Sequence, residues 1–292
     1  MQQNGKNHFQ KNENLCKNLQ RFFLLHPLTD FLQCAIIVLH YWCNTWSWEG
    51  ITRIMKNVKK KLIQGLCIVL AIVLVLLSLS WINAYRAHHV DPIAQSVLDQ
   101  IDLEQAKKLM IVAHPDDETL WGGGHLSEGD YLVVCITHGS DKTRSAEFYS
   151  VMEASGNQGI MLSYPDKVNG KRDDWEAVQD GISADLEKVI ELKTWDLIVT
   201  HNEAGEYGHI HHKKTNQIVT QYYQQADCTI PLYTFGTYHR KAALPDYEQD
   251  MTRIPDDQLQ KKEELLSLYH SQERTIENLS HMNPYEEWTL VS

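Results

Sequence analysis

A run of 21 residues, Leu62 to Ile82, constrains the possible structures of this chain more than any other segment. It contains no charged residue, and its polar side chains are few and scattered. A helix of this length matches the hydrocarbon core of a bilayer. A buried core helix would show a polar face, and a cleaved signal peptide usually has a shorter apolar core. We therefore expect a membrane-spanning helix here.

The residues before this run set its expected orientation. Basic residues belong on the cytoplasmic side of a membrane helix, so the rest of the chain would lie on the extracytoplasmic side of the cell membrane. Met55 directly precedes the basic cluster, and we expect it to be the natural start, with residues 1–54 an unassigned extension. The alternative is that this extension forms an interfacial or re-entrant segment. The basic residues are Lys56, Lys59, Lys60 and Lys61.

Charge is distributed unevenly along the chain. Up to Lys61 there are nine Lys and Arg against three Asp and Glu, whereas the remainder has 18 against 35. An acidic domain argues against nucleic acid as a partner, because phosphate contacts need basic side chains. Cys135 and Cys228, the cysteines of this domain, stand in no ligand-like spacing, and we interpret them as structural.

Strand and helix patterns alternate beyond a polar connector at residues 85–106. This alternation predicts an α/β fold for residues 107–292: a Rossmann-like, doubly wound, mostly parallel sheet with helices on both faces. Residues 55–84, the basic flank and signal-anchor, precede it as a transmembrane helix. The expected strands are Leu109–Ala113, Tyr131–Thr137, Gly159–Ser163, Asp196–Thr200 and Pro231–Tyr238. The expected helices are Arg144–Ser155, Asp173–Leu192, His211–Tyr223 and Pro255–Tyr269.

The first strand is followed at once by a histidine and two adjacent carboxylates. His114 and Asp117 lie three residues apart at the carboxyl end of a parallel strand, where open α/β sheets bind ligands. Imidazole and carboxylate together suit zinc, and Asp116 would be free to take a proton from water. The alternative is a helix N-terminus with acidic residues in its first turn. The glycines Gly122 to Gly124 indicate a turn leading into a helix.

A second polar motif follows the strand that ends at Thr200. His209 and His212 lie three residues apart and could face the same crevice from the opposite side. One of them would complete a three-ligand zinc site, and the other would be free to act on a substrate. The alternative is a solvated histidine cluster. Tyr207 could donate a hydrogen bond to an oxyanion or a sugar hydroxyl, or could be an ordinary aromatic residue at a strand end.

These motifs resemble the LmbE/PIG-L family of zinc-dependent N-acetylglucosaminyl deacetylases. The resemblance extends from about Lys107 to about Gln272. It is carried by His-Pro-Asp-Asp-Glu after a strand and by the later Gly-His-x-x-His. Weaker elements are Arg144-x-x-Glu147, Tyr164-Pro165-Asp166 and Ser271-Gln272.

The resemblance implies roles for individual residues. One zinc ion per chain would be bound by His114, Asp117 and His212. Asp116 would be the general base, and His209 an acid or electrostatic partner. The remaining implied residue, Arg144, would contact the substrate, or else pair with Glu147 along its helix. Many members carry Asp where this chain has His211, a departure that bears on the protonation state of His209.

The function predicted from these features is a membrane-anchored zinc hydrolase, bound to the membrane through Leu62 to Ile82. Its substrate would be an N-acetylated amino sugar in a glycan or glycoconjugate that contains GlcNAc. Two alternatives stay open. One is a cytoplasmic-type deacetylase of a small GlcNAc glycoside or GlcNAc-lipid. The other is an inactive carbohydrate-binding protein of the same fold.

Overall fold

A computed structural model describes residues 57–226 and 228–291 of this chain. The predicted extension at residues 1–54 and the predicted start at Met55 lie outside the described residues. The chain divides into two compact units, one up to Ile82 and one from Asn83 onward, and each is described by itself.

Helix α3, Asn57–His88, contains the predicted membrane segment. Its stretch Leu62–His88 is long and apolar enough to cross a membrane, as judged by length and composition. Among the described residues it is the one helix with this property. Large apolar side chains are exposed along it, from Leu62 to Trp81.

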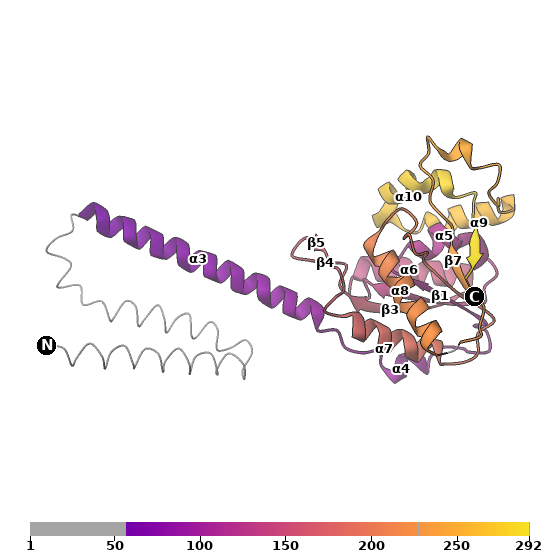
Figure 1. Ribbon diagram of the computed structural model, residues 1–292, viewed down its shortest axis with the longest axis horizontal. Coiled ribbons are helices and arrows are strands. Elements are labelled where there is room, and N and C mark those ends of the chain that lie inside the picture. Colours follow the sequence, from indigo (N-terminus) through magenta and orange to yellow (C-terminus); the bar gives the residue numbers. More distant parts are fainter. Residues whose placement is uncertain (1–56, 227, 292) are drawn as a thin grey trace. The chain divides into compact units, whose positions relative to one another are not determined.

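The predicted fold class is confirmed by a six-stranded, mostly parallel sheet (Figure 1). The strand order is β3-β2-β1-β6-β7-β8, and only the pairing of β7 with β8 is antiparallel. Its strands are β1 (Lys108–Val112), β2 (Tyr131–Thr137), β3 (Gln158–Tyr164), β6 (Ile198–Thr200), β7 (Leu232–Phe235) and β8 (Trp288–Leu290). All five expected strands are therefore present, and β8 is an additional edge strand that the sequence patterns did not indicate. A separate hairpin pairs β4 (Lys167–Val168) with β5 (Lys171–Arg172).

Helices cover both faces of the sheet, as a doubly wound fold requires. Side chains alternate along β1, so that Leu109 and Ile111 join one core while Met110 and Val112 join the other. The first core is completed by α7 and α8, and the second by α5, α6 and α9. The helices are α4 (Gln95–Leu98), α5 (Asp117–Leu126), α6 (Lys142–Ser155), α7 (Gln179–Ile190), α8 (Ile210–Gln225), α9 (Asp256–Leu266) and α10 (Glu273–Leu279).

The three consecutive glycines lie inside helix α5, which begins before them. The backbone of Gly122 is non-helical, with φ −148° and ψ 15°, so the expected turn before a helix is instead a kink within one. Close packing explains their presence. A Cβ atom at Gly123 would lie 2.6 Å from Cγ of Lys262, and one at Gly124 would lie 3.0 Å from a carboxylate oxygen of Glu286. Glycine thus allows α9 and the C-terminal segment to approach the helix that begins at Asp117.

The strand order places a topological switch point between β1 and β6. The chain runs outward from β1 through β2 to β3, and then returns to the other side of β1. A crevice at the carboxyl ends of the strands is the expected result at such a point. His114 follows β1 and His201 follows β6, so both stand at this crevice.

A buried ion pair joins α9 to the C-terminal segment beside α5. Nζ of Lys262 lies 2.8 Å from Oε1 of Glu286, and both side chains are completely buried. The carboxylate also accepts hydrogen bonds from the amide of Gly124 at 2.7 Å and from the ring of His125 at 2.7 Å. Burial alone would raise the pKa of Glu286, but the charges of Lys262 and His125 hold it at about 2.

Replacing Glu286 with Gln should lower the free energy of unfolding at pH 7 by about 3 kcal/mol, because the charge of Lys262 would remain buried without its partner. The difference between wild type and variant should be constant above pH 4.5, where the unfolded carboxyl is ionised. It should shrink as the pH falls from 4.5 toward 2, because the folded-state pKa is depressed. Urea unfolding at several pH values measures this. Glu263→Gln, on the exposed side of α9, should change the unfolding free energy by less than about 0.5 kcal/mol.

Candidate metal centre

A pocket of about 720 Å³ opens at the carboxyl ends of the parallel strands. Its walls come from the loops after β1, β2, β3 and β6, together with the segment after α9. Most of the predicted site residues line it: His114, Asp116, Asp117, Arg144, Tyr207 and His209. The seventh, His212, is completely buried beside Asp117.

The carboxylate of Asp117 lies between two imidazole rings. Its Oδ2 atom is 3.0 Å from Nδ1 of His114 and 3.3 Å from Nε2 of His212. It also accepts the backbone amide of His114 at 2.9 Å, which fixes the loop after β1. Three overlapping sets of described residues bring possible ligand atoms within 4.8 Å of one another: His114, His209 and His212; His114, Asp166 and His211; and Asp117, His201 and His212.

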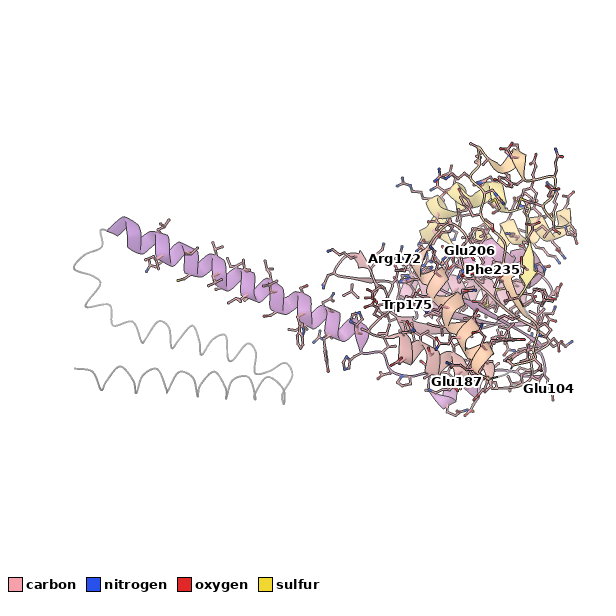
Figure 2. All side chains as sticks on the ribbon, in the orientation of Figure 1. Glu104, Arg172, Trp175, Glu187, Glu206 and Phe235 are labelled. Carbon is pink, nitrogen blue, oxygen red and sulfur yellow. The ribbon has the colours of Figure 1, made fainter. Side chains whose placement is uncertain are left out.

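The ring of His212 is oriented by a buried carboxylate, Glu206, which is labelled in Figure 2. Nδ1 of His212 forms a short hydrogen bond to Oε2 of Glu206. Because a carboxylate accepts, Nδ1 of His212 carries a proton, and Nε2 is the ring nitrogen directed toward Asp117. This Nε2 is buried and forms no hydrogen bond with the described part of the chain. Burial of the ring lowers the pKa of His212, but the carboxylates of Asp117 and Glu206 outweigh this effect and raise the pKa to about 9.

His201 is a structural histidine at this site. Its Nε2 accepts the amide of Ala113 at 3.0 Å, and its Nδ1 donates to Glu206 at 3.1 Å. The ring stacks on His212 with centroids 3.9 Å apart. Because both ring nitrogens already have partners, His201 holds the loop and Glu206 in place and is a poor candidate for a metal ligand.

His211, the departure from the family pattern, is oriented by its own contacts. Its Nε2 donates to the carbonyl oxygen of Asp173 at 2.7 Å, and its ring stacks on Trp175 at 4.0 Å (Figure 2 labels Trp175). Burial lowers the pKa of His211 to about 3, so the ring is neutral and Nδ1 is an acceptor. This Nδ1 lies 3.1 Å from Nε2 of His114. The side chain of His211 therefore forms a hydrogen bond with His114, whereas it meets the ring of His209 edge-on, with centroids 5.5 Å apart.

The orientation of His211 also determines which nitrogen of His114 carries the proton. Both neighbours of its Nε2 are acceptors: Nδ1 of His211, and Oδ1 of Asp166 at 3.3 Å. Nε2 of the neutral ring therefore carries the proton, and Nδ1 presents a lone pair to the carboxylate of Asp117. A lone pair of His114 and Nε2 of His212 thus face one carboxylate oxygen. With a pKa of about 9, the ring of His212 carries a second proton on Nε2 at neutral pH, and a metal ion bound here would replace that proton. Two imidazoles and one carboxylate form a donor set that suits zinc.

Asp116, directly before α5, has a backbone conformation that is rare for this residue type. Its φ is 122°, and its amide donates to Oε2 of Glu118 at 3.0 Å. The carboxylate of Glu118 is completely buried and accepts the hydroxyl of Tyr269 at 2.6 Å. Strain of this kind persists only where the surroundings impose it. Burial and the charge of Asp117 raise the pKa of Asp116 to about 7.

Arg144 belongs to this centre and does not form the expected ion pair with Glu147. Its Nη2 lies 3.4 Å from Oδ2 of Asp116 and also contacts the carbonyl oxygen of Pro115, while its Nε is buried without a partner in the described residues. Glu147 instead accepts the amide and the hydroxyl of Ser271, at 2.7 and 2.6 Å. The guanidinium is thus available to the pocket.

His209 and Tyr207 face the pocket from the start of α8. Nδ1 of His209 accepts the amide of His211 at 3.2 Å and so caps the helix. Nε2 of His209 takes no part in this cap. Burial lowers the pKa of His209 to about 2, so the neutral ring carries its proton on Nε2. Tyr207 is 44% exposed and packs edge-on against His212. Gly205 makes this tight loop possible, because a Cβ there would lie 2.6 Å from the carbonyl oxygen of His209.

Several residues that support the centre were not assigned a role from the sequence. Three of them have a weak sequence signal: Asp166 follows a strand, Glu206 stands inside the second histidine motif, and Glu118 ends the first. Tyr269 had no such signal, because it is brought to Glu118 across 151 positions of sequence. The missed residues are Glu118, Asp166, Glu206 and Tyr269.

Comparison with known proteins supports the resemblance. Residues 109–223 match the family model described as PIG-L: GlcNAc-PI de-N-acetylase. This match confirms the resemblance to the LmbE/PIG-L family that the motifs predicted. An uncharacterized protein of Acanthamoeba polyphaga mimivirus is 34% identical over 132 residues, or 39% of this chain; the match spans 57% of that protein.

A solved structure is also similar to this chain. It is the crystal structure of a deacetylase–bog complex in the biosynthesis pathway of teicoplanin. The two chains share 15% sequence identity with a TM-score of 0.49, over 63% of this chain and 96% of that chain.

Replacing Glu206 with Gln should weaken zinc binding by about 10- to 100-fold, because His212 would lose the charge that orients its ring. Competition with a chelator of known zinc affinity measures the change. Glu203→Gln is the matched control, since Glu203 is exposed in the same loop. Equal zinc affinity in the Glu206 variant and the wild type would exclude Glu206 as the residue that orients the ligand.

Proposed function

We propose that this chain is a membrane-anchored, zinc-dependent hydrolase that removes N-acetyl groups from a glycan or glycoconjugate containing GlcNAc. The single observation that carries the proposal is the carboxylate of Asp117 between Nδ1 of His114 and Nε2 of His212, with Asp116 beside it. The match to a family model described as a de-N-acetylase supports the reaction type.

His114, Asp117 and His212 would hold one zinc ion per chain. Two imidazoles and one carboxylate form a three-residue ligand set of the kind that catalytic zinc sites use. When bound, zinc would polarise the amide carbonyl and lower the pKa of a water molecule. The partners behind these ligands, Glu206 and His211, would keep both rings in the tautomer that the metal needs.

Asp116 is the proposed general base. It lines the pocket, and Arg144 holds its Oδ2 while Glu118 holds its amide. A carboxylate oxygen of Asp116 would take a proton from water as the water oxygen bonds to the amide carbon. The same carboxyl group can then deliver that proton to the amide nitrogen. The C–N bond breaks, and the products are acetate and a free amine.

His209 and Tyr207 are the proposed partners of the oxyanion. Nε2 of His209 would donate a hydrogen bond to the oxygen that gains charge as water adds. The hydroxyl of Tyr207, on the exposed side of the pocket, would donate to the same oxygen or to a sugar hydroxyl. Both roles need only neutral donors, which suits the neutral imidazole of His209.

The pocket also offers groups for the sugar. Arg144 has a buried Nε without a partner in the described residues, and a substrate hydroxyl could accept from it. Lys167 and Arg172, from the hairpin of β4 and β5, also line the pocket. Basic groups at the rim also suit a glycan that carries phosphate or carboxylate elsewhere in its structure.

Replacing Asp116 with Ala should reduce acetate release from GlcNAc substrates by about 100- to 10,000-fold, because no other carboxylate would be held at this position. Zinc content should stay at one ion per chain, since the proposed ligands are untouched. Asp196→Asn, at an exposed position on the far side of β6, is the control and should retain full activity. The assay is acetate release from GlcNAc, chito-oligomers, peptidoglycan fragments and a GlcNAc glycolipid.

The outcomes of that assay separate the alternatives. Unchanged acetate release in the Asp116 variant would contradict the proposed base. Binding of a glycan without any turnover by the zinc-loaded wild type would favour the inactive binding protein. Release from the small free glycoside alone would favour the cytoplasmic-type deacetylase.

We further propose that α3 anchors the catalytic domain on the extracytoplasmic side. The support is its apolar stretch and the lysines that precede it in sequence. Protease added to intact cells that express the chain with a C-terminal tag should therefore remove the tag. Replacing Lys59, Lys60 and Lys61 with Ser should increase the protected fraction. Removal of the tag only after the cells are permeabilised would place the catalytic domain on the cytoplasmic side.

A further inference from the structure

A second pocket, of about 610 Å³, lies at the amino ends of the strands, away from the metal centre. Lys108 and Tyr131 begin β1 and β2 at this edge. Helix α5 separates the two pockets: its first residue, Asp117, lines the catalytic pocket, and His125 near its end lines the second. Ten helical residues correspond to about 15 Å. The two pockets are therefore separate sites.

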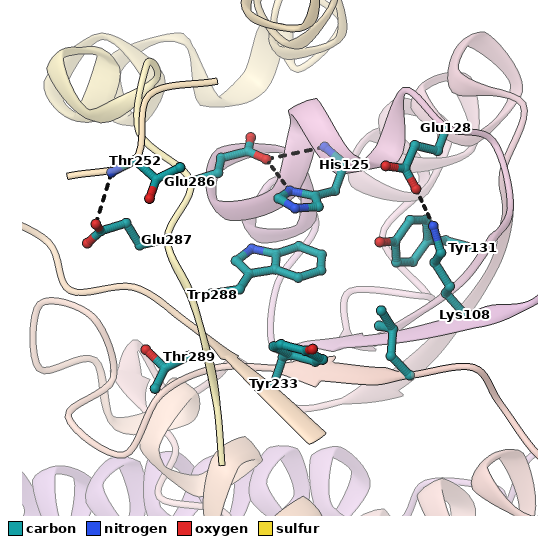
Figure 3. Close-up of a pocket in the computed structure, with 11 residues that line it drawn as sticks. Lys108, His125, Glu128, Tyr131, Tyr233, Thr252, Glu286, Glu287, Trp288 and Thr289 are labelled. Carbon is teal, nitrogen blue, oxygen red and sulfur yellow. Dashed lines mark hydrogen bonds and ion pairs between the residues drawn. The ribbon is translucent and has the colours of Figure 1, made fainter. Parts of the chain in front are cut away.

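Aromatic rings define this second pocket. The indole of Trp288 stacks on His125 at 3.8 Å with an interplanar angle of 14°, and its Nε1 donates to the carbonyl oxygen of Trp121 at 3.2 Å. Tyr131 stands nearly perpendicular to the indole, with centroids 6.4 Å apart. Figure 3 shows Trp288 between His125 and Tyr233. His125 thus covers one face of the indole, and the hydrogen bond to Trp121 fixes the orientation of the ring before any ligand binds.

Tyr131 carries the most informative polar group. The residue is only 1% exposed, yet it lines the pocket, and its hydroxyl forms no hydrogen bond with the described part of the chain. Figure 3 shows this hydroxyl directed toward Trp288. A hydroxyl that faces the pocket can both donate to and accept from water or a ligand group there. Burial and nearby carboxylates raise the pKa of Tyr131, so the group is a neutral donor and acceptor.

Carboxylates outnumber the basic groups at this pocket. Lys108 is shared by Glu128 and Asp130, and Glu286 pairs with Lys262. Glu287 accepts the amide of Thr252 at 3.0 Å. The surplus of carboxylates disfavours an anionic ligand. The remaining chemistry, aromatic faces beside hydroxyl and carboxylate groups, suits a neutral ligand that is apolar on one face and rich in hydroxyls at its edge.

We propose that this pocket binds a neutral pyranose residue, with one sugar face on Trp288 and Tyr233 and a sugar hydroxyl bonded to Tyr131. The site is an accessory glycan-binding site. It contains none of the residues of the proposed reaction, so it stands whether or not the chain hydrolyses amides. A chain that holds sugar at both pockets would favour glycans of several residues over a free monosaccharide.

Fluorine NMR of the full chain labelled with 5-fluorotryptophan tests this directly, in a polyoxyethylene detergent that carries neither sugar nor ammonium groups. The Trp288 resonance is assigned by its loss in Trp288→Phe. Adding the GlcNAc tetramer should shift this resonance. In Tyr131→Phe, which removes only the hydroxyl, the same shift should need about five- to tenfold more sugar. Tyr149→Phe, at an exposed tyrosine on α6, should behave as wild type.

The remaining outcomes are equally definite. A tetramer that leaves the Trp288 resonance unmoved would overturn the proposal, as would equal titrations for Tyr131→Phe and wild type. A response to tetramethylammonium but not to sugar would make the pocket a cation site. Tyr131→Phe should retain wild-type zinc content and acetate release, which separates this site from the catalytic one. Should acetate release fail in the wild type as well, the Trp288 titration still decides this proposal.

Discussion

The carboxylate oxygen of Asp117 between Nδ1 of His114 and Nε2 of His212 is the interaction on which the account of this protein depends. Behind each ring stands an acceptor that fixes its proton: Glu206 for His212, and His211 for His114. The lone pair of His114, Nε2 of His212 and the charge of Asp117 are thereby held close together. The pKa of about 9 gives His212 a second proton on Nε2 at neutral pH, and a bound metal ion would take the place of that proton.

The fold supplies the framework for this geometry. β1 and β6 are parallel neighbours. After β1 the chain continues to β2 on one side, and after β6 it continues to β7 on the other side, so a crevice forms between the loops that follow β1 and β6. The loop after β1 is fixed through Glu118, which joins the strained backbone of Asp116 to Tyr269 beyond α9. Tyr269, which has no proposed catalytic role, thus helps to position the proposed base, Asp116.

The sequence indicated the strands, the sheet type and the two histidine motifs because each depends on a local pattern. Uninterrupted apolar runs mark β1 and β2, and polar residues directly after a strand mark the crevice. What the sequence could not indicate depends on contacts between distant segments. Tyr269 reaches Glu118, and His211 reaches His114, only in the folded chain. The glycines of α5 were interpreted as a turn because the close approach of α9 leaves no local signal.

X-ray absorption at the zinc K-edge of the zinc-loaded full chain tests the proposed ligands. We expect a spectrum of nitrogen and oxygen ligands that includes two imidazoles, without sulfur. Asp117→Ala should alter the oxygen contribution, and His209→Ala should leave the two imidazoles in place. Three imidazoles in the wild type, with one lost in His209→Ala, would contradict the assignment of His114, Asp117 and His212.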